Sequence, residues 1–192
     1  YGGAIYNNKS TINSIAGDFI GNYAYGHSEA LGGAVYNSEG TIGNIKGNFI
    51  RNYAFAYKGS AQGGAIYYSV HAPELNIEGN FLENYAIGAT ASAQGGALYI
   101  SYLKNYGNIN GNFIGNYVSG YTGASGGALY HLGNANSYKY SKMGNINANF
   151  IRNHATSATG SAYGGALYNR YGTIGNLDES GNLIGGIYGS FI

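Results

Sequence analysis

The chain has 192 residues, of which 35 are glycine and one is proline. Only 9% of the residues are charged and the formal net charge is +1, which excludes the strong field of a nucleic-acid or anionic-lipid binding surface. An apolar content of 44% excludes a disordered chain, and the single proline excludes collagen. The sequence has no apolar run of about 20 residues and no cysteine, so we expect neither membrane insertion of this segment nor a disulfide framework.

Two motifs recur along the chain. Gly-Gly-Ala-(Ile/Val/Leu)-Tyr starts at positions 2, 32, 63, 95, 126 and 164, and Phe-x-x-Asn follows it within each of the first five repeats. The residues of the second motif form a predicted structural ladder: Phe19, Phe49, Phe81, Phe113, Phe150, Asn22, Asn52, Asn84, Asn116 and Asn153. A spacing of 30–32 residues in most repeats indicates stacked units that share one core.

In chain order, the repeats cover residues 2–31, 32–62, 63–94, 95–125, 126–163 and 164 onwards. Length varies in the first turn of each repeat: the third repeat carries Pro73 there, and the fifth expands the turn into His131–Met143. In the sixth repeat, Leu183 and Gly186 take the places of Phe and Asn. We predict a single repeat domain over residues 1–192. Because position 1 lies inside a repeat, we expect the chain to be a fragment of a longer one.

The repeats favour short strands over helices. Their apolar residues form clusters such as Ala34-Val35-Tyr36, bounded by Gly, Asn and Ser, without helical periodicity. We therefore predict an all-β parallel β-helix (solenoid) of about six coils, with one coil per repeat. Stacking at this period would place Lys46 beside Glu78 and Arg51 beside Glu83, and both pairs have opposite charge. A propeller blade would need four strands in a longer repeat.

Asparagine is concentrated in three columns of equivalent positions. One is the Asn of Phe-x-x-Asn. The second comprises Asn44, Asn76, Asn108, Asn145 and Asn176, and the third Asp18, Asn48, Asn80, Asn112, Asn149 and Asn182. Amides stacked at strand spacing can bond as donor and acceptor, so we interpret these columns as structural ladders. The alternative is a polar stripe that binds a ligand.

Tyrosine forms two further columns. The candidate binding stripe comprises Tyr6, Tyr36, Tyr67, Tyr99, Tyr130 and Tyr168. Strand alternation places Ala and Tyr of the pentapeptide on one face and the aliphatic residue on the other. If the aliphatic residue faces inward, the six rings face outward and could bind a sugar or a protein; the alternative is a partly buried ladder. The second column contains Tyr23, Tyr53, Tyr85 and Tyr117, continued by His154.

Signals for catalysis are weak. The acids are Asp18, Asp178, Glu29, Glu39, Glu74, Glu78, Glu83 and Glu179. Only Glu78 and Glu83 share the body of one repeat, and each has a cationic stacking partner. The histidines, His27, His71, His131 and His154, occur singly in unrelated columns. We predict no catalytic residue, no cofactor and no metal site, because paired carboxylates and ligand clusters do not recur.

The combination of Gly-Gly-Ala-(Ile/Leu/Val) with Phe-x-x-Asn resembles the repeats of chlamydial polymorphic outer-membrane proteins and related autotransporter adhesin passengers. The resemblance covers residues 1–186, although the chlamydial proteins frequently contain cysteine and this chain has none. It implies a right-handed parallel β-helix in an extracellular location or on the bacterial cell surface, at the outer membrane, usually acting in adhesion.

The predicted function is therefore a non-catalytic, adhesin-like passenger segment. Its expected partner is a protein or glycan on a host or neighbouring cell. A filament subunit that stacks end to end is a rival interpretation, since the apolar stretches near both ends carry no charge to protect strand edges. A polysaccharide-active β-helix enzyme is a second rival. An ice-binding β-helix is a third, and the pattern supports it less well.

Overall fold

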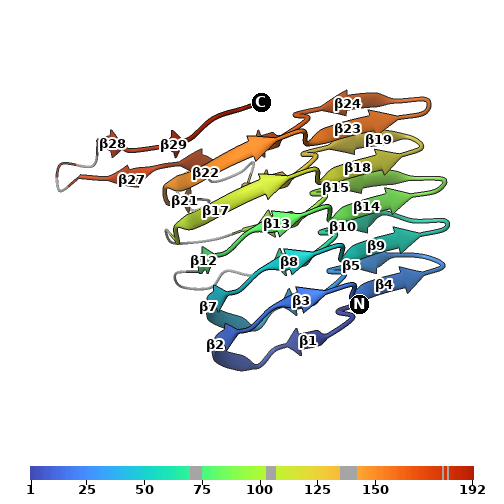
Figure 1. Ribbon diagram of the computed structural model, residues 1–192, viewed down its shortest axis with the longest axis horizontal. Coiled ribbons are helices and arrows are strands. Elements are labelled where there is room, and N and C mark those ends of the chain that lie inside the picture. Colours follow the sequence, from blue (N-terminus) through green and yellow to red (C-terminus); the bar gives the residue numbers. More distant parts are fainter. Residues whose placement is uncertain (70–74, 103–106, 135–141, 179, 181) are drawn as a thin grey trace.

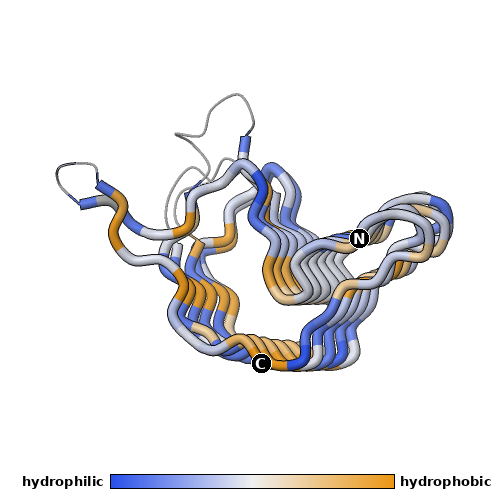
Figure 2. Tube along the Cα trace, turned by 90° about the horizontal axis from the view of Figure 1, so that it is seen from above, coloured by the Kyte–Doolittle hydropathy of each residue, from blue (hydrophilic) through white to orange (hydrophobic). Residues whose placement is uncertain are grey.

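The protein is a parallel β-solenoid of about five turns (Figure 1). The computed structural model describes residues 1–69, 75–102, 107–134, 142–178, 180 and 182–192, which contain strands and no helix. From the N-terminus the chain rises counterclockwise when seen from above, so the solenoid is right-handed (Figure 2). The count is nearer five than the predicted six because only five strands occur in each of two sheets.

Sheets A and B enclose the wider part of the cross-section, which we call the main lobe. Sheet A contains the strands after the Gly-Gly motifs: β1 (Ile5–Asn8), β6 (Val35–Ser38), β11 (Ile66–Ser69), β16 (Leu98–Ser101), β20 (Leu129–Leu132) and β25 (Leu167–Arg170). Sheet B contains β2 (Thr11–Ala16), β3 (Phe19–Ile20), β7 (Thr41–Lys46), β8 (Phe49–Ile50), β12 (Asn76–Glu78), β13 (Phe81–Leu82), β17 (Ile109–Ile114), β22 (Ile146–Ile151) and β29 (Ile187–Tyr188).

Sheets C and D form a second, narrow lobe beside the first (Figure 2). Sheet C contains β4 (Tyr23–Gly26), β9 (Tyr53–Ala56), β14 (Tyr85–Gly88), β18 (Tyr117–Gly120) and β23 (His154–Ser157). Sheet D contains β5 (Ala30–Leu31), β10 (Ala61–Gln62), β15 (Ser92–Gln94), β19 (Gly123–Ser125) and β24 (Ser161–Tyr163). Each turn of the chain therefore runs through A, B, C and D before it returns to the next Gly-Gly motif.

Equivalent residues of successive repeats pair directly, which confirms one turn per repeat. Phe81 of β13 pairs with Phe49 below it and Phe113 above it. The predicted ion pairs are present as well: Lys46 Nζ lies 3.0 Å from Glu78, and Arg51 Nε lies 2.7 Å from Glu83. A third pair, Lys9 with Glu39 at 3.5 Å, also joins neighbouring turns.

The last repeat departs from the predicted alignment. The short strands β21 (Lys142–Met143) and β26 (Thr173–Ile174) pair in parallel, whereas β27 (Asn176–Leu177) and β28 (Leu183–Ile184) form an antiparallel pair. This pair inserts residues before the next turn, so Leu183 does not replace the ladder Phe. Phe191 does: its ring stacks on Phe150 with centroids 5.0 Å apart. The predicted equivalence of Leu183 with the ladder Phe was wrong because the insertion shifts the period.

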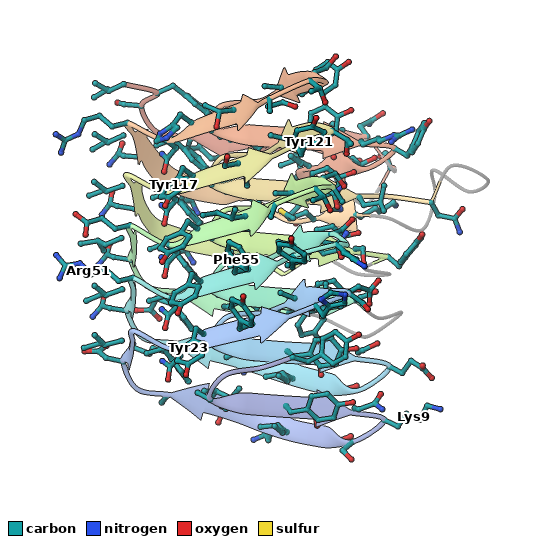
Figure 3. All side chains as sticks on the ribbon, turned by 90° about the vertical axis from the view of Figure 1, so that its right-hand side faces the viewer. Lys9, Tyr23, Arg51, Phe55, Tyr117 and Tyr121 are labelled. Atoms are coloured by element: carbon teal, nitrogen blue, oxygen red, sulfur yellow. The ribbon has the colours of Figure 1, made fainter. Side chains whose placement is uncertain are left out.

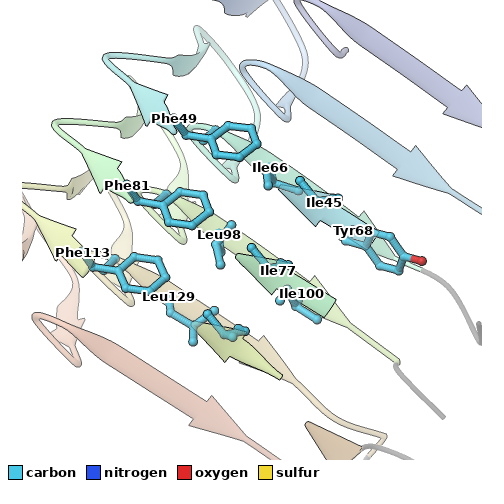
Figure 4. Packing of buried hydrophobic residues seen from close by; sticks show 14 of the residues in the cluster. Ile45, Phe49, Ile66, Tyr68, Ile77, Phe81, Leu98, Ile100, Phe113 and Leu129 are labelled. Atoms are coloured by element: carbon cyan, nitrogen blue, oxygen red, sulfur yellow. The ribbon is translucent and has the colours of Figure 1, made fainter. Parts of the chain in front are cut away.

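Large side chains fill the main lobe. Phe49, Phe81 and Phe113 are fully buried and stack with ring centroids 4.8–4.9 Å apart. The aliphatic residues of sheet A, including Ile66 and Leu98, pack against them from the opposite wall (Figure 4). Because a Phe→Ala change in such a core costs about 3–5 kcal/mol, this column is a principal source of stability.

Small side chains fill the narrow lobe. Its core consists of Ala24, Ala30, Ala54, Ala56, Ala61, Ala86, Ala93, Val118 and Ala124. Alanine brings the two sheets close together, and the larger residues that alternate with it along sheet C must therefore point outward. The narrow lobe thus reverses the usual pattern: its interior side chains are small, and its exterior side chains are large.

The Gly-Gly motif lies at the junction of the two lobes. Gly63 has φ +65°, which favours glycine, and a Cβ on Gly64 would lie 2.0 Å from the carbonyl oxygen of Gly96. Ala34 and Val35 are both buried in the main core, so the prediction that Ala shares the outward face with Tyr was wrong. Strand alternation begins only at Val35, after the bend that contains Ala34.

Candidate functional site

The Asn ladder of Phe-x-x-Asn lies between the lobes, and its interior members Asn52, Asn84 and Asn116 are buried. Asn84 Nδ2 donates to the carbonyl oxygen of Phe49 at 2.8 Å and to Asn116 Oδ1 at 3.0 Å. Its Oδ1 accepts from the backbone N–H and the Nδ2 of Asn52, at 2.9 and 3.0 Å. Both amide hydrogens and both acceptor positions of Asn84 are occupied, so this residue has no group left for a ligand.

A second ladder lies on the outer face of sheet B. Asn80 Nδ2 donates to Asn48 Oδ1 at 3.0 Å, and Asn80 Oδ1 accepts from the N–H and the Nδ2 of Asn112. The column begins at Asp18, whose Oδ1 accepts two bonds from Asn48. Within the described residues, each amide of this ladder donates one of its two hydrogens to the ladder residue below it.

The predicted tyrosine stripe points outward from sheet A but is open only at one end. Tyr6 is 56% exposed, whereas Tyr99 and Tyr130 are only 6% and 4% exposed. Burial raises the pKa of the phenol groups of Tyr99 and Tyr130 above the ordinary value. From Tyr6 to Tyr168 the rings stack with centroids 5.0–5.4 Å apart, so each interior ring has both flat faces covered. Binding by this column stays a prediction.

A second outward aromatic surface lies on sheet C. We define the aromatic face by the outward residues Tyr23, Tyr25, Tyr53, Phe55, Tyr85, Ile87 and Tyr117. Tyr25 is 67% exposed, and its ring stacks on that of Phe55 with centroids 5.1 Å apart. Figure 3 shows Tyr23, Phe55 and Tyr117 on one side of the stack. The face becomes polar toward the last turns, where Ser119 and Thr156 follow Ile87 in the same column.

A groove of 540 Å³ runs along one edge of the aromatic face. It is lined by Gly21, Arg51, Tyr53, Glu83, Tyr85, Gly115, Tyr117 and His154. Arg51 and Glu83 have φ +54°, a conformation that the glycines at the equivalent positions 21 and 115 adopt without strain. Burial raises the pKa of Tyr85 and of Tyr117, which agrees with their half-buried position against the groove wall.

The ionisable residues do not gather into a catalytic or metal site within the part of the chain that the structure describes. No three His, Asp or Glu residues lie close enough there to hold a metal ion. Glu78 and Glu83 are exposed and bound to their cationic partners. His131 is buried with Nδ1 2.8 Å from Asn169 Oδ1, and burial lowers its pKa to about 4. His71, Glu74, Glu179 and Pro73 lie outside the described residues.

Comparison with known proteins adds no family assignment. No protein-family model, curated protein or solved structure matches this chain. A search of the described residues for a helix long and apolar enough to cross a membrane also finds none.

Sequence reasoning identified the column of Tyr23 but missed the column of Tyr25 and Phe55 beside it. The available signal was Tyr-Ala-(Tyr/Phe/Ile), in which the small residue alternates with two large ones. Alternation with a small interior residue predicts a thin lobe with an aromatic exterior. This pattern is the reverse of the usual one, in which large apolar residues mark the inside of a strand.

Proposed function

We propose that the chain is a non-catalytic, adhesin-like segment of an extracellular or bacterial surface protein that binds a partner protein through the aromatic face. The observation that supports this proposal is the exposure of Tyr23 and Tyr25 on sheet C, where half-buried Phe55 continues the column of Tyr25. Contiguous exposed apolar surface of this kind is typical of interaction sites, and Tyr is enriched at the centre of protein interfaces. The resemblance to autotransporter passengers suggests the surface location.

The arrangement of the rings favours a protein over a glycan as the partner of this face. A sugar packs on the open flat side of an aromatic ring, but Tyr53, Tyr85 and Tyr117 use their flat sides to stack at 4.9 Å. What they offer to a partner is a corrugated surface of ring edges and hydroxyl groups. A protein surface with apolar side chains and carbonyl oxygens complements such edges.

The proposal can be tested by binding of the fluorescently labelled chain to a panel of bacterial and epithelial cells. We expect binding to at least one cell type, loss of that binding after protease treatment of the cells, and a reduction of about tenfold for the double variant Phe55→Ser/Tyr85→Ser. A matched control is Asn44→Ser, which changes an exposed residue of sheet B. Failure to bind any cell, or equal binding by both variants, would contradict the proposal.

Polysaccharide cleavage is the rival from another functional class. Incubation with acidic and neutral polysaccharides, followed by measurement of chain length, separates the two functions. Cleavage that is abolished by Glu78→Gln or Glu83→Gln would replace the binding proposal with an enzyme. End-to-end assembly into filaments stays a prediction from the sequence, and light scattering of the same preparation measures it.

A further inference from the structure

A column of aliphatic side chains runs along the outer face of sheet B. It consists of Ile20, Ile50, Leu82 and Ile114, and Ile151 continues it in the next turn. Each of these residues follows the Phe that points into the main lobe, so strand alternation directs it outward. Ile50, Leu82 and Ile114 remain partly exposed although each has aliphatic neighbours in the turns above and below. We call the first four residues the aliphatic stripe; a contiguous apolar surface of this kind is typical of interaction sites.

A charged column borders the aliphatic stripe and has a definite order. Arg51 and Glu83 occupy the two middle turns of this column. The turns below and above them have glycine at the same position, Gly21 and Gly115, and Arg152 follows in the fifth turn. From the first turn to the fourth, the column therefore reads neutral, positive, negative, neutral. Inversion exchanges the two charges, so these four turns are complementary to an inverted copy of themselves.

The other charged column of sheet B has the same order. Lys46 lies in the same turn as Arg51, and Glu78 lies in the same turn as Glu83. In an inverted copy, each positive level would meet a negative level at both columns. In a copy with the same direction, like charges would share each level, which is unfavourable. The charges of sheet B therefore favour one relative direction of two copies.

The ion pair within one chain leaves groups for a second partner. Arg51 donates to Glu83 Oε2 through Nε at 2.7 Å, and within the described residues its two terminal nitrogens make no hydrogen bond. The guanidinium fork can bind a second carboxylate with these nitrogens, and an inverted copy would supply that carboxylate from its own Glu83. Asp18 would lie level with Asn112 of that copy, whose amide donates only one of its hydrogens within the described residues.

We propose that two copies of the chain associate through the aliphatic stripe as a symmetric, antiparallel dimer. The two-fold axis would run along the strand direction between the second and third turns. Ile50 of one copy would then face Leu82 of the other, and Arg51 would face Glu83 in the same way. Such an interface uses the same surface on both copies and closes at two. The stripe is small compared with a standard interface of roughly 1,600 Å², so the Kd of the dimer should be about 10–100 µM.

The symmetry has a consequence for the aromatic face. Sheet C follows sheet B along the strand direction in each copy, so this axis would direct both narrow lobes toward the same side (Figure 1). A partner surface could then contact two aromatic faces at once, which strengthens weak binding through effective concentration. The dimer itself does not depend on the function proposed for the aromatic face, because the stripe lies on sheet B.

Sedimentation equilibrium of the chain between about 1 µM and about 1 mM tests the proposal. We expect a monomer–dimer equilibrium that weakens as the salt concentration rises, because opposite charges meet at the interface. Leu82→Ser should weaken association about tenfold by removing an apolar contact from each copy. Ile87→Ser is the matched control, since Ile87 is also a partly exposed aliphatic residue but lies on sheet C.

Charge reversal separates association from the stability of one chain. Arg51→Glu places two carboxylates beside the stripe, and Glu83→Arg places two guanidinium groups there, so each variant alone should associate about tenfold more weakly. An equimolar mixture of the two variants should recover association, because the positive column of one chain then meets the negative column of the other. The double variant Arg51→Glu/Glu83→Arg should associate like the parent chain. Circular dichroism checks that every variant is folded.

Four results would overturn the proposal. They are a parent chain that stays monomeric at the highest concentration, an equal loss of association in Ile87→Ser, no recovery in the mixture of the two charge variants, and growth beyond the mass of a dimer. Cell binding by the aromatic face can fail while the dimer forms, and the dimer can fail while cell binding persists. The two proposals are therefore tested separately.

Discussion

The buried and exposed asparagine ladders have the same residue type and the same turn-to-turn spacing, yet they differ in what they can do. Asn84 makes four side-chain hydrogen bonds and is fully buried. The side chain of Asn80, four residues earlier, bonds within the described residues only to the ladder residues above and below it, and Asn80 remains partly exposed. The buried ladder also donates upward along the stack, whereas the exposed ladder donates downward.

This difference shows that the unused hydrogen-bonding groups of a repeated polar residue decide its role. A residue with none left is structural, whereas a residue with some left is available to a ligand. The buried ladder joins the main lobe to the narrow lobe through the carbonyl oxygens of the Phe column. The exposed ladder has no such third partner within the described residues, so its remaining hydrogens face water. Breaking each ladder should therefore have different consequences.

The largest effect is expected for Asn84→Ala. Its removal takes the Asn84 side chain away from three buried groups: the backbone N–H of Asn52, the Nδ2 of Asn52 and the carbonyl of Phe49. Asn116 Oδ1 keeps the bond from the backbone N–H of residue 84. At roughly 1–3 kcal/mol for each buried group, and allowing for relaxation, the free energy of unfolding should fall by about 4 kcal/mol. Asn80→Ala is the matched truncation and should cost at most about 1 kcal/mol. Urea unfolding of both variants measures the difference; equal losses would refute the comparison.

A smaller effect should follow from pH at His131, a buried polar residue in a column that also contains Asn37 and Asn169. Its pKa is lowered to about 4 in the folded state, chiefly by burial, from 6.5 in the unfolded chain. The unfolded state therefore binds the proton more tightly. The stabilisation is complete above pH 6.5 and is lost as the pH falls toward 4, by about 3 kcal/mol in total.

His131→Asn isolates this contribution because it introduces a residue found elsewhere in the column. The variant should lose less stability than the parent chain between pH 7 and pH 4, as measured by urea unfolding at each pH. Identical pH profiles of the two chains would show that His131 is not held neutral by burial. The acids contribute equally to both profiles, so they cancel in the comparison.

The smallest effect is expected at Glu83, the immediate neighbour of Asn84. Glu83 is exposed, and its carboxylate lies 2.7 Å from Arg51 Nε. Exposed ion pairs contribute little, so Glu83→Gln should shift the melting temperature by less than about 2 °C. Scanning calorimetry at low and high salt provides the measurement. A large, salt-dependent shift of the melting temperature would indicate that the Arg51–Glu83 pair, and not the buried Asn ladder beside it, stabilises the turn at Glu83 and Asn84.

The period of the sequence was sufficient to predict the stacking and the ladders. Gly63 and Phe81 mark fixed points of one turn, and the constant spacing of identical residues predicted the parallel register that the structure shows. The predicted pairs Lys46–Glu78 and Arg51–Glu83 followed from the same register. Local chemistry and global fold agree at these positions, which is why single-sequence reasoning succeeded.

Other features depend on contacts between segments that are distant in the sequence, and no local pattern contains these contacts. Tyr99 and Tyr130 are covered although their column points outward, so their burial could not be predicted from strand alternation. The place of Phe191 in the ladder could not be predicted either, because the antiparallel pair β27–β28 lengthens the last repeat. The exposed Asn column of sheet B was predicted, but the hydrogens that its amides leave unused became evident only from the bonds that each amide makes.

The parallel pairing of every turn with the turns above and below it also bears on how such a molecule can change during evolution. Each turn repeats the same cross-section, so duplication or deletion of one whole repeat would leave the lateral contacts of the remaining turns intact. The height of the molecule would change in steps of about 4.8 Å, while its surface chemistry at each level stayed the same. The number of repeats in the gene thus sets the height of the solenoid, while its cross-section stays fixed.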